Sequence, residues 1–592
     1  MNNSKNINRI KKLRKLISDN QLDAFLIPHE DEFLSEYLPK YTERLKWITG
    51  FTGSAGLSII STNKAAIFVD GRYTTQVKLE TFNKAFDYFH LINPGLFKWI
   101  EKNPYKLKRL GFDPRTISQS NYKALNYSCA KKGIKLIESK NLIDELWKRK
   151  KERNNKVAIH ELKYSGLSSS KKRNKIVSYL KKHKVNSLFI SQPENLCWLL
   201  NIRGNDLEHT PIVRSSAVIT KDNSITIFTD NKNIKGKIHQ WIGKEIEILN
   251  FNNIKNFISK TNFKSIQFDP NYTPSNIAKI FNNFILETFE RDDPITLLKA
   301  CKNSTEINGS RKAHLIDGIA LTKFLCWLDT SSSETRIDEL TTCEELLKYR
   351  KRSKSFKSLS FNTISGTGSN GAIIHYKSNK KSNKFLKEND LFLLDSGGQY
   401  KYGTTDVTRT ISIAKDQKKI DYEKIINFTL VLKGHIALAL EHFKYGETGL
   451  KLDYLARKFL KKNGLNFDHG TGHGVGSYLG VHEGPQNISP RSRIVLEKGM
   501  IISNEPGYYK ENEYGIRIEN LVTVVKSKNK NKDLTMETLT LAPIDKKLID
   551  KSLLTKKEIS WLNNYHNKVY RKLNPYLNKK EKLWLKNSTK AI

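Results

Sequence analysis

Cysteine is scarce in this sequence, and its spacing excludes two kinds of scaffold. The 592 residues include only five cysteines, an odd number with no C-x-x-C pair: Cys129, Cys197, Cys301, Cys326 and Cys343. Disulfide-built secreted domains and cysteine-ligated zinc sites both need paired, suitably spaced cysteines. We therefore expect reduced thiols in the core of a cytoplasmic protein.

Long apolar runs are also missing. No stretch approaches the roughly 20 apolar residues that a membrane span requires, so we expect no membrane partner. The first 20 residues are basic, but no apolar segment follows them, which excludes the pattern of a secretory signal. Within them, the spacing of Ile10, Leu13 and Leu16 predicts an amphipathic helix.

Acidic residues are few relative to basic ones, at 60 against 102, and the net charge is +42. Such a charge can indicate nucleic-acid binding. However, the lysines are scattered through the whole sequence, and no zinc-finger, RNP or basic-zipper pattern accompanies them. We therefore predict a lysine-rich solvated surface without a specific nucleic-acid partner. It should attract polyanions weakly and in a salt-dependent way.

A chain of 592 residues is too long for one hydrophobic core. Strand, turn and helix patterns alternate in the first half, which predicts α/β units. The segments GFDPRTIS around Asp113 and QFDPNYTP around Asp269 each follow an apolar strand and precede a helix, which indicates a diverged duplication. We place a charged linker at 148–156. The predicted domains are 1–153, 154–293, 294–530 and 531–592.

The second half begins with two predicted helices, over 304–327 and 336–351, followed by strands and glycine turns. Near the C-terminus, Thr555 and Glu558 form the pattern of a helix capping box. All candidate metal ligands lie between these helical regions.

The segment DHGTGHGVG, residues 468–476, alternates glycine with two histidines that are four residues apart. Glycine lets the backbone approach a ligand closely. Carboxylates stand on both sides of the segment in the chain. Four acids and one imidazole suit a pair of divalent cations such as manganese better than they suit a structural zinc ion, which is usually bound by sulfur. The candidate ligands are Asp395, Asp406, His473, Glu505 and Glu519.

Residues 390–413 predict a β-hairpin with a long turn. Asp395 falls at the tip of the first strand, and Thr404, Asp406 and Thr408 fall on one face of the second. Two carboxylates on adjacent strands repel each other, at a cost that a cation relieves. The alternative is that both aspartates simply serve turns.

Glu505 precedes a proline, which favours an extended backbone. Residues 513–524 predict one alternating strand on which Arg517 and Glu519 point the same way, so that Arg517 can orient the carboxylates. A glutamate on a strand is usually solvated, but Glu519 lies within an apolar stretch.

Three further histidines adjoin glycines or short strands: His375, His469 and His482. Together with the acids they indicate an active site. By contrast, the G-x-G-x-x-G at 366–371 runs into a predicted strand rather than a helix, so we do not interpret it as a dinucleotide-binding site.

The motifs IIHY, LLDSGGQYKYGTTDVTRT, DHGTGHGVGSYLGVHEGP, SNEPGYY and GIRIEN resemble the M24 metallopeptidases of pita-bread fold, and within them the aminopeptidase P family. The resemblance extends to ITGFTGSAG, VDGRY and CWLLNIRGND near the N-terminus and to TLTLAPID near the C-terminus. It implies a multidomain α/β and α+β protein. Two creatinase-like N-terminal α/β domains would precede a pita-bread catalytic domain with a C-terminal extension.

The resemblance also implies roles for the site residues. Asp395 would chelate one metal, His473 and Glu505 the second, and Asp406 and Glu519 would bridge two divalent cations, with Mn²⁺ expected. Glu505 would also accept a proton, and the three other histidines would be catalytic. The implied substrates are peptides with proline in second position, and the implied assembly is a homodimer. A prolidase, another M24 peptidase and a non-catalytic binding protein are the alternatives.

Overall fold

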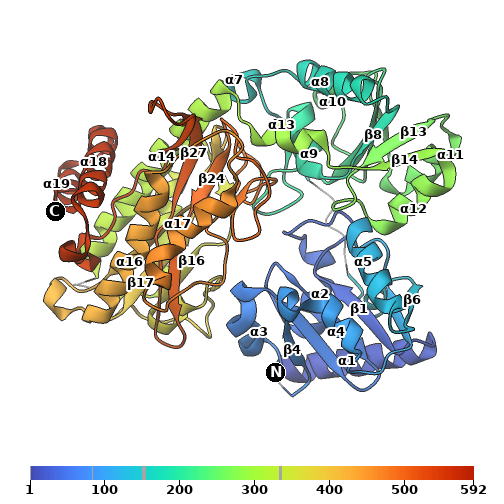
Figure 1. Ribbon diagram of the computed structural model, residues 1–592, viewed down its shortest axis with the longest axis horizontal. Helices are drawn as coiled ribbons and strands as arrows, with labels where there is room; N and C mark the ends of the chain where they lie inside the picture. Colours follow the sequence, from blue (N-terminus) through green and yellow to red (C-terminus); the bar gives the residue numbers. More distant parts are fainter. Residues whose placement is uncertain (1, 83, 150–154, 333–335) are drawn as a thin grey trace. The chain divides into compact units, whose positions relative to one another are not determined.

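The computed structural model describes residues 2–82, 84–149, 155–332 and 336–592. The chain forms two compact units (Figure 1). The first comprises Met1–His160, Leu167–Glu208 and Ile212–Thr296, and the second comprises Glu161–Gly166, His209–Pro211 and Leu297–Ile592. Most of the predicted linker, 150–154, lies outside the described residues. None of the described helices is both long enough and apolar enough to cross a membrane.

The first unit contains two six-stranded sheets with the same topology. One has the order β4-β3-β2-β1-β5-β6 and the other β12-β11-β10-β8-β13-β14. In both sheets the first three strands along the chain pair antiparallel, and the remaining pairs are parallel. The first sheet comprises β1 (Ala24–Pro28), β2 (Gly56–Ser61), β3 (Ala65–Val69), β4 (Asp87–His90), β5 (Arg109–Phe112) and β6 (Lys135–Glu138). The second comprises β8 (Ser187–Ile190), β10 (Ser215–Thr220), β11 (Ile225–Thr229), β12 (Glu247–Leu249), β13 (Ser265–Phe268) and β14 (Glu287–Glu290).

The loops that follow β5 and β13 bind each other reciprocally. The backbone N–H of Gln119 donates to the carbonyl of Thr273, and that of Ser275 donates to Ile117, both at 2.9 Å. In each case the donor begins α5 (Gln119–Ala130) or α12 (Ser275–Phe284). Equivalent atoms therefore exchange equivalent bonds, which is the arrangement of a local two-fold axis. The identical topology and this symmetry support the predicted duplication around Asp113 and Asp269.

Each strand of a covered sheet must present apolar side chains to both faces. In β1, Phe25 and Ile27 belong to one buried cluster, and Ala24 and Leu26 belong to another. This alternation follows from the two-residue period of a strand. The predicted N-terminal helix is present as α1 (Asn2–Asp19) and covers the first of these clusters. Its Ile10, Leu13 and Ile17 are buried, while Leu16 is only partly buried.

The second unit packs helices around several small antiparallel sheets. Its sheets have the orders β16-β17-β20, β15-β18-β19, β21-β28-β27-β24, β22-β23 and β25-β26. The strands are β15 (Phe356–Leu359), β16 (Ile364–Thr367), β17 (Leu391–Ser396), β18 (Gly398–Tyr400), β19 (Gly403–Thr404), β20 (Val407–Ser412), β21 (His442–Phe443), β22 (Gly472–His473), β23 (Asn487–Ile488), β24 (Ile501–Asn504), β25 (Gly507–Lys510), β26 (Tyr514–Arg517), β27 (Asn520–Lys526) and β28 (Leu534–Thr538). The helices are α14 (Ser304–Ser331), α15 (Glu339–Lys351), α16 (Tyr422–Ala439) and α17 (Gly449–Lys461). The two helices expected at its start are thus present as α14 and α15, and Figure 1 shows α16 and α17 lying over the strands.

The C-terminal segment is part of the core of this unit. Its helices are α18 (Lys556–Leu573) and α19 (Lys579–Ser588). Leu562 and Val569 of α18 are buried in the same cluster as Phe428 and Ile436 of α16. The capping box predicted before α18 is present, with Thr555 at the N-cap.

Several local predictions are wrong. Strands β17 and β20 pair as expected, but β18 and β19 lie between them and join another sheet, so 390–413 is not a simple hairpin. The strand predicted over 513–524 is broken between β26 and β27. No strand follows the G-x-G-x-x-G motif, because residues 368–372 form a 3-10 helix. Cys301 and Cys343 are only partly buried, unlike the other three cysteines.

Candidate active site

The two candidate aspartates come from adjacent strands. Asp395 lies in β17, directly opposite Thr408 of β20. Asp406 lies in the two-residue segment before β20, so it does not share a strand face with Thr404 and Thr408 as predicted. Both carboxylates are nevertheless buried in the same region.

His473 reaches the site because glycines flank it. A side chain on Gly472 would place its Cβ 1.9 Å from the carbonyl oxygen of Ser503, and one on Gly474 would lie 2.0 Å from that of Glu483. Only glycine fits at these close approaches. The His473 N–H donates to the Ser503 hydroxyl at 2.8 Å. These glycines thus allow close packing of the protein's own backbone, whereas from the sequence we expected them to admit a ligand.

The two candidate glutamates come from neighbouring antiparallel strands. Glu505 directly follows β24, and Glu519 directly precedes β27, at the place where Asn504 and Asn520 face each other in register. The Glu505 N–H donates to Thr471 at 2.9 Å, and the Glu519 N–H donates to the carbonyl of Thr408 at 3.1 Å. The ends of both strands therefore aim at the same region as Asp406.

The predicted ligand atoms are close together. Nε2 of His473 is 3.4 Å from Oε1 of Glu505 and 3.6 Å from Oδ2 of Asp406. One ligand atom from each of Asp406, His473 and Glu519 lies within 4.8 Å of the others. Asp395 is close enough that its charge raises the pKa of Asp406, Glu505 and Glu519.

Burial and mutual repulsion make these acids unusual. Burial is the largest cause that raises the pKa of Asp406 and Glu519 well above the ordinary range, and neighbouring carboxylates raise them further. The pKa of Glu505 rises to about 7, chiefly through burial, although Arg517 opposes the shift. The chain alone therefore leaves excess negative charge here.

The donor set fits divalent cations. Three buried carboxylate oxygens accept no hydrogen bond from any residue that the structure describes: Oδ1 of Asp395, Oδ1 of Asp406 and Oε1 of Glu519. Buried polar atoms without a partner are costly, so such oxygens call for a ligand. Carboxylate oxygens with one imidazole are suited to hard or borderline divalent metals.

Arg517 contacts the acids, but differently from the prediction. Its Nη2 donates to Oδ2 of Asp395 at 2.7 Å, and its Nε donates to the Thr408 hydroxyl at 3.1 Å. That hydroxyl in turn donates to Oε2 of Glu519 at 2.8 Å. Arg517 thus reaches Glu519 only through a threonine, because the break after β26 separates the two residues that the sequence placed on one strand.

The three other predicted histidines lie in different surroundings. His469 Nε2 lies 2.9 Å from the hydroxyl of Tyr509. The His482 ring packs against His473 with centroids 4.4 Å apart. His375 is half-buried and follows Ile374, whose carbonyl accepts a 3.4 Å hydrogen bond from Arg517.

Sequence reasoning missed several residues that hold the site. Tyr509 accepts a 2.7 Å hydrogen bond from Arg517, and its position four residues after Glu505 is the one signal that could have found it. Glu483, next to His482, is buried between Lys299, at 2.8 Å, and Lys302. No local pattern distinguishes these two lysines among the 102 basic residues.

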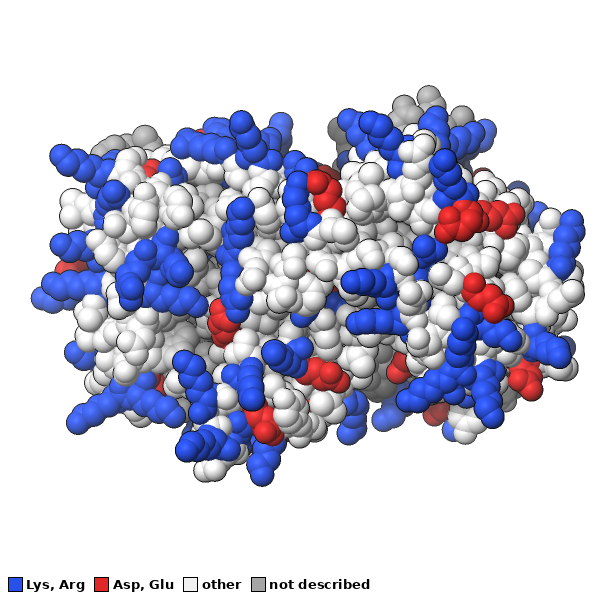
Figure 2. Space-filling view, turned by 90° about the horizontal axis from the view of Figure 1, so that it is seen from above, with Lys and Arg blue, Asp and Glu red and all other residues white. Residues whose placement is uncertain are grey.

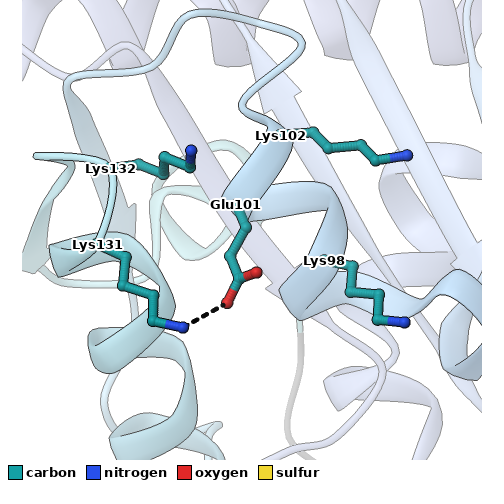
Figure 3. A pocket seen from close by; sticks show the side chains of 5 residues that line it. All are labelled: Lys98, Glu101, Lys102, Lys131 and Lys132. Atoms are coloured by element: carbon teal, nitrogen blue, oxygen red, sulfur yellow. Dashed lines mark hydrogen bonds and ion pairs between the residues drawn. The ribbon is translucent and has the colours of Figure 1, made fainter.

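Outside this cluster, the first unit contains a basic hollow of about 460 Å³. Lys98, Lys102, Lys131 and Lys132 line it, and Glu101 pairs with Lys131 at 3.5 Å (Figure 3). It contains none of the predicted catalytic residues. Figure 2 shows Lys and Arg side chains scattered across the visible face, with acids between them, rather than gathered in one band.

Comparisons with known proteins identify the domains of the chain. The profile described as "Metallopeptidase family M24" matches residues 308–526, and that of the "C-terminal region of peptidase_M24" matches 532–592. Two profiles described as "Creatinase/Prolidase N-terminal domain" match 9–146 and 148–306. The fold predicted from the resemblance, two creatinase-like domains before an M24 domain and its C-terminal region, is therefore confirmed.

Full-length relatives narrow the family. "Probable Xaa-Pro aminopeptidase P" of Coprinopsis cinerea is 36% identical over 98% of this chain and 97% of its own length. "Xaa-Pro aminopeptidase 1" of Dictyostelium discoideum is 35% identical over 99% of this chain and 96% of its own. The crystal structure of X-prolyl aminopeptidase from Caenorhabditis elegans, "a cytosolic enzyme with a di-nuclear active site", superimposes with a TM-score of 0.94 at 32% identity. It covers 99% of this chain and 100% of its own. The chain belongs to the Xaa-Pro aminopeptidases of metallopeptidase family M24.

Proposed function

We propose that this enzyme removes the first residue from peptides that carry proline in second position, using two divalent cations held by the acid cluster. The full-length similarity to Xaa-Pro aminopeptidases supports the substrate class. The observation that carries the metal proposal is the set of buried carboxylate oxygens without a described donor, beside the imidazole of His473.

In this proposal Asp395, Asp406, His473, Glu505 and Glu519 would together hold the two cations. Bound cations would offset the repulsion that raises the pKa of the acids, and they would supply an activated water at neutral pH. We favour Mn²⁺, since the ligand set is mostly oxygen with one imidazole.

The chain's own residues then position the substrate and move protons. Glu505 would take up a proton during the reaction and later return it. His482 and His375 would donate hydrogen bonds to the oxygen of the peptide carbonyl as negative charge develops on it. Arg517 fixes the orientation of Asp395 through the hydrogen bond from its Nη2 to Oδ2, and Asp395 would attract the free α-amine of the substrate.

A preference for proline has a simple physical basis. The nitrogen of an Xaa-Pro bond carries no hydrogen. Peptidases that hold the scissile bond through this N–H therefore lose a contact. A site that relies on carboxylates and histidines around the carbonyl does not need that donor.

The cellular setting is a separate proposal. We propose a cytoplasmic enzyme, supported by the description of the Caenorhabditis elegans protein as cytosolic and by the free cysteines. The homodimer implied by the sequence resemblance stays a prediction, to be checked by sedimentation or light scattering.

The decisive experiment compares an Arg-Pro-Pro tripeptide with a Gly-Pro dipeptide after chelation and re-addition of Mn²⁺. We expect Mn²⁺-dependent release of arginine from the tripeptide. The Asp406→Ala protein, purified and assayed in parallel, should release none.

Cleavage of the dipeptide alone would make the enzyme a dipeptidase. If neither peptide is cleaved while two Mn²⁺ ions are bound, the proposed activity is wrong, and a binding role of the fold becomes the better hypothesis.

A further inference from the structure

A layer of buried polar side chains lies behind Glu505 and Glu519, on residues that have no predicted role. Asn504 and Asn520 adjoin the two glutamates and pair in register between β24 and β27. His435 from α16 and Arg409 from β20 pack against them, and all four side chains are buried. Four buried polar groups in one place require an explanation, since each is costly unless it is satisfied.

His435 ties the two strands together. Its Nδ1 donates to the carbonyl oxygen of Asn504 at 3.1 Å, and its Nε2 accepts from Nδ2 of Asn520 at 3.0 Å. Its own carbonyl accepts from Nδ2 of Asn504 at 2.9 Å. The Asn504 carbonyl belongs to the peptide bond that leads into Glu505. The ring therefore fixes the plane of that peptide.

The roles of the two ring nitrogens require a neutral imidazole. Oδ1 of Asn520 accepts from Arg409, so its Nδ2 is the atom that faces His435. A ring nitrogen that accepts a hydrogen bond carries no proton. Burial agrees with this assignment, because it lowers the pKa of His435 to about 3.

Arg409 fixes the peptide bond that follows Glu519, as His435 fixes the one that precedes Glu505. Its Nη1 donates to the carbonyl of Glu519 at 2.7 Å, and its Nη2 donates to Oδ1 of Asn520 at 2.8 Å. The Glu519 carbonyl belongs to the peptide bond that joins it to Asn520. Among the described residues, Arg409 donates its hydrogen bonds to carbonyls, an amide and a hydroxyl, and to no carboxylate.

The network continues into the C-terminal extension. Nη2 of Arg409 also donates to the carbonyl of Ala542 and to the hydroxyl of Tyr565 in α18, both at 2.9 Å. Its Nε donates to the carbonyl of Pro543 at 2.9 Å. The guanidinium thus joins the backbone of the extension to the backbone of Glu519.

We propose that His435 and Arg409 are positioning residues. Each fixes one peptide plane beside a candidate metal ligand, and Asn520 couples the two. Together they set the spacing of Glu505 and Glu519 before any cation arrives, and they make the C-terminal extension a structural support of the metal site. This inference rests on the proposed metal-binding role of the two glutamates.

The test measures Mn²⁺ binding to the metal-free protein by isothermal titration calorimetry. Replacing His435 with leucine removes both ring hydrogen bonds, and we expect Mn²⁺ affinity to fall about 10- to 100-fold, as when groups supporting a metal ligand are lost. His435→Gln keeps one donor and one acceptor at a similar spacing. It should restore the affinity to within about three-fold.

His314→Leu is the matched control. His314 is also buried, but its Nδ1 contacts the Ser310 carbonyl of its own helix at 2.7 Å. We expect this variant to lose thermal stability and keep wild-type Mn²⁺ affinity. Equal losses of affinity in His314→Leu and His435→Leu would overturn the proposal, because the effect would then be general softening of the core.

Arg409→Lys gives an independent measurement that does not depend on folding of the leucine variant. Lysine keeps the charge but cannot span the same acceptors, so Mn²⁺ affinity should again fall at least about ten-fold. Wild-type affinity in this variant would overturn the role of Arg409. If the unaltered enzyme itself binds no Mn²⁺, the failure lies with the proposed metal site rather than with the positioning network.

Discussion

The buried acids of the second unit are of two kinds, which differ in whether positively charged side chains neutralise them. Glu483 lies between Lys299 and Lys302. Burial raises the pKa of its carboxyl, but the two ammonium groups outweigh burial, so that the pKa is lowered. Asp406 and Glu519, equally buried, have a raised pKa, because burial and neighbouring carboxylates outweigh the charge of Arg517. The first arrangement is complete within the chain, and the second is not.

This difference separates acids that are neutralised within the chain from the candidate metal ligands. Asp317 resembles Glu483 in being paired within the chain. Its carboxylate is bound by Arg350 at 2.8 Å and by the Tyr400 hydroxyl at 2.7 Å. Burial alone is therefore not the sign of an active site. The sign is burial without enough positive charge from the chain.

The largest change in stability should come from removing the charge of Glu483, which neutralises Lys299 and Lys302. Glu483→Gln would leave two lysine ammonium groups buried without a carboxylate. We expect the free energy of unfolding to fall by about 3–5 kcal/mol, as for other buried pairs that lose one partner. Urea denaturation of the metal-free protein measures it. The exposed pair Lys451–Glu447, at 2.9 Å, provides the control, and Glu447→Gln should leave the free energy of unfolding nearly unchanged.

The incomplete arrangement should respond to pH with the sign of a raised pKa. Between its ordinary pKa of 4.5 and about 7, Glu505 stays protonated in the folded protein but ionises in the unfolded chain. Metal-free protein should therefore lose stability as pH rises through this window, by at most about 1.4 kcal/mol per pH unit from this group.

Denaturation at several pH values in the presence of chelator measures this slope, with Glu505→Gln for comparison. The variant should show a flatter profile than the unaltered protein. An identical slope in both would contradict the assignment of the effect to Glu505. Mn²⁺ competes with protons, so we expect its affinity to rise over the same window.

Removing one site acid should have the opposite sign to removing Glu483. Asp406→Asn takes away one of several repelling carboxylates, so the metal-free variant should be more stable by about 1–2 kcal/mol. Differential scanning calorimetry with and without Mn²⁺ tests this. A loss of stability in chelator would show that Asp406 resembles the acids that are neutralised within the chain, contrary to our comparison.

The smallest effect concerns the surface charge. Charge reversal at Lys98, Lys102, Lys131 and Lys132, which line the basic hollow, should weaken binding to heparin slightly. The slope of log affinity against log salt should fall by about one for each lysine that touches a phosphate or sulfate. Peptidase activity should stay unchanged. Sequence-selective nucleic-acid binding at physiological salt would instead favour a dedicated nucleic-acid function.

The sequence predicted those parts of the molecule that depend on local patterns. The helix around Leu13, the capping box at Thr555 and the repeated strand-loop-helix around Asp113 and Asp269 follow from periodicity and capping preferences. The ligand-bearing segments were found because glycine, histidine and acids are concentrated in them. Only the family resemblance indicated which residues of these separate segments come together in one site.

Contacts between distant segments could not be predicted. His435 lies in the middle of an apolar helix, and nothing near it indicates that its ring meets Asn504 and Asn520 some 70 to 85 positions away. The break between β26 and β27 was missed for a related reason. Alternation continues through Ile518, but the hydrogen-bond partners change from one sheet to another at Glu519.

The reciprocal contact between the loops after β5 and β13 has a consequence for how the two α/β domains hold together. Self-complementary surfaces of this kind are those of two-fold homodimers, in which each copy offers the same patch to the other. Here both copies belong to one polypeptide, and the effective concentration of a tethered partner is on the order of millimolar. Four backbone hydrogen bonds, which include Ser120 to Pro270 and Asn276 to Pro114, can then suffice where two separate proteins would dissociate.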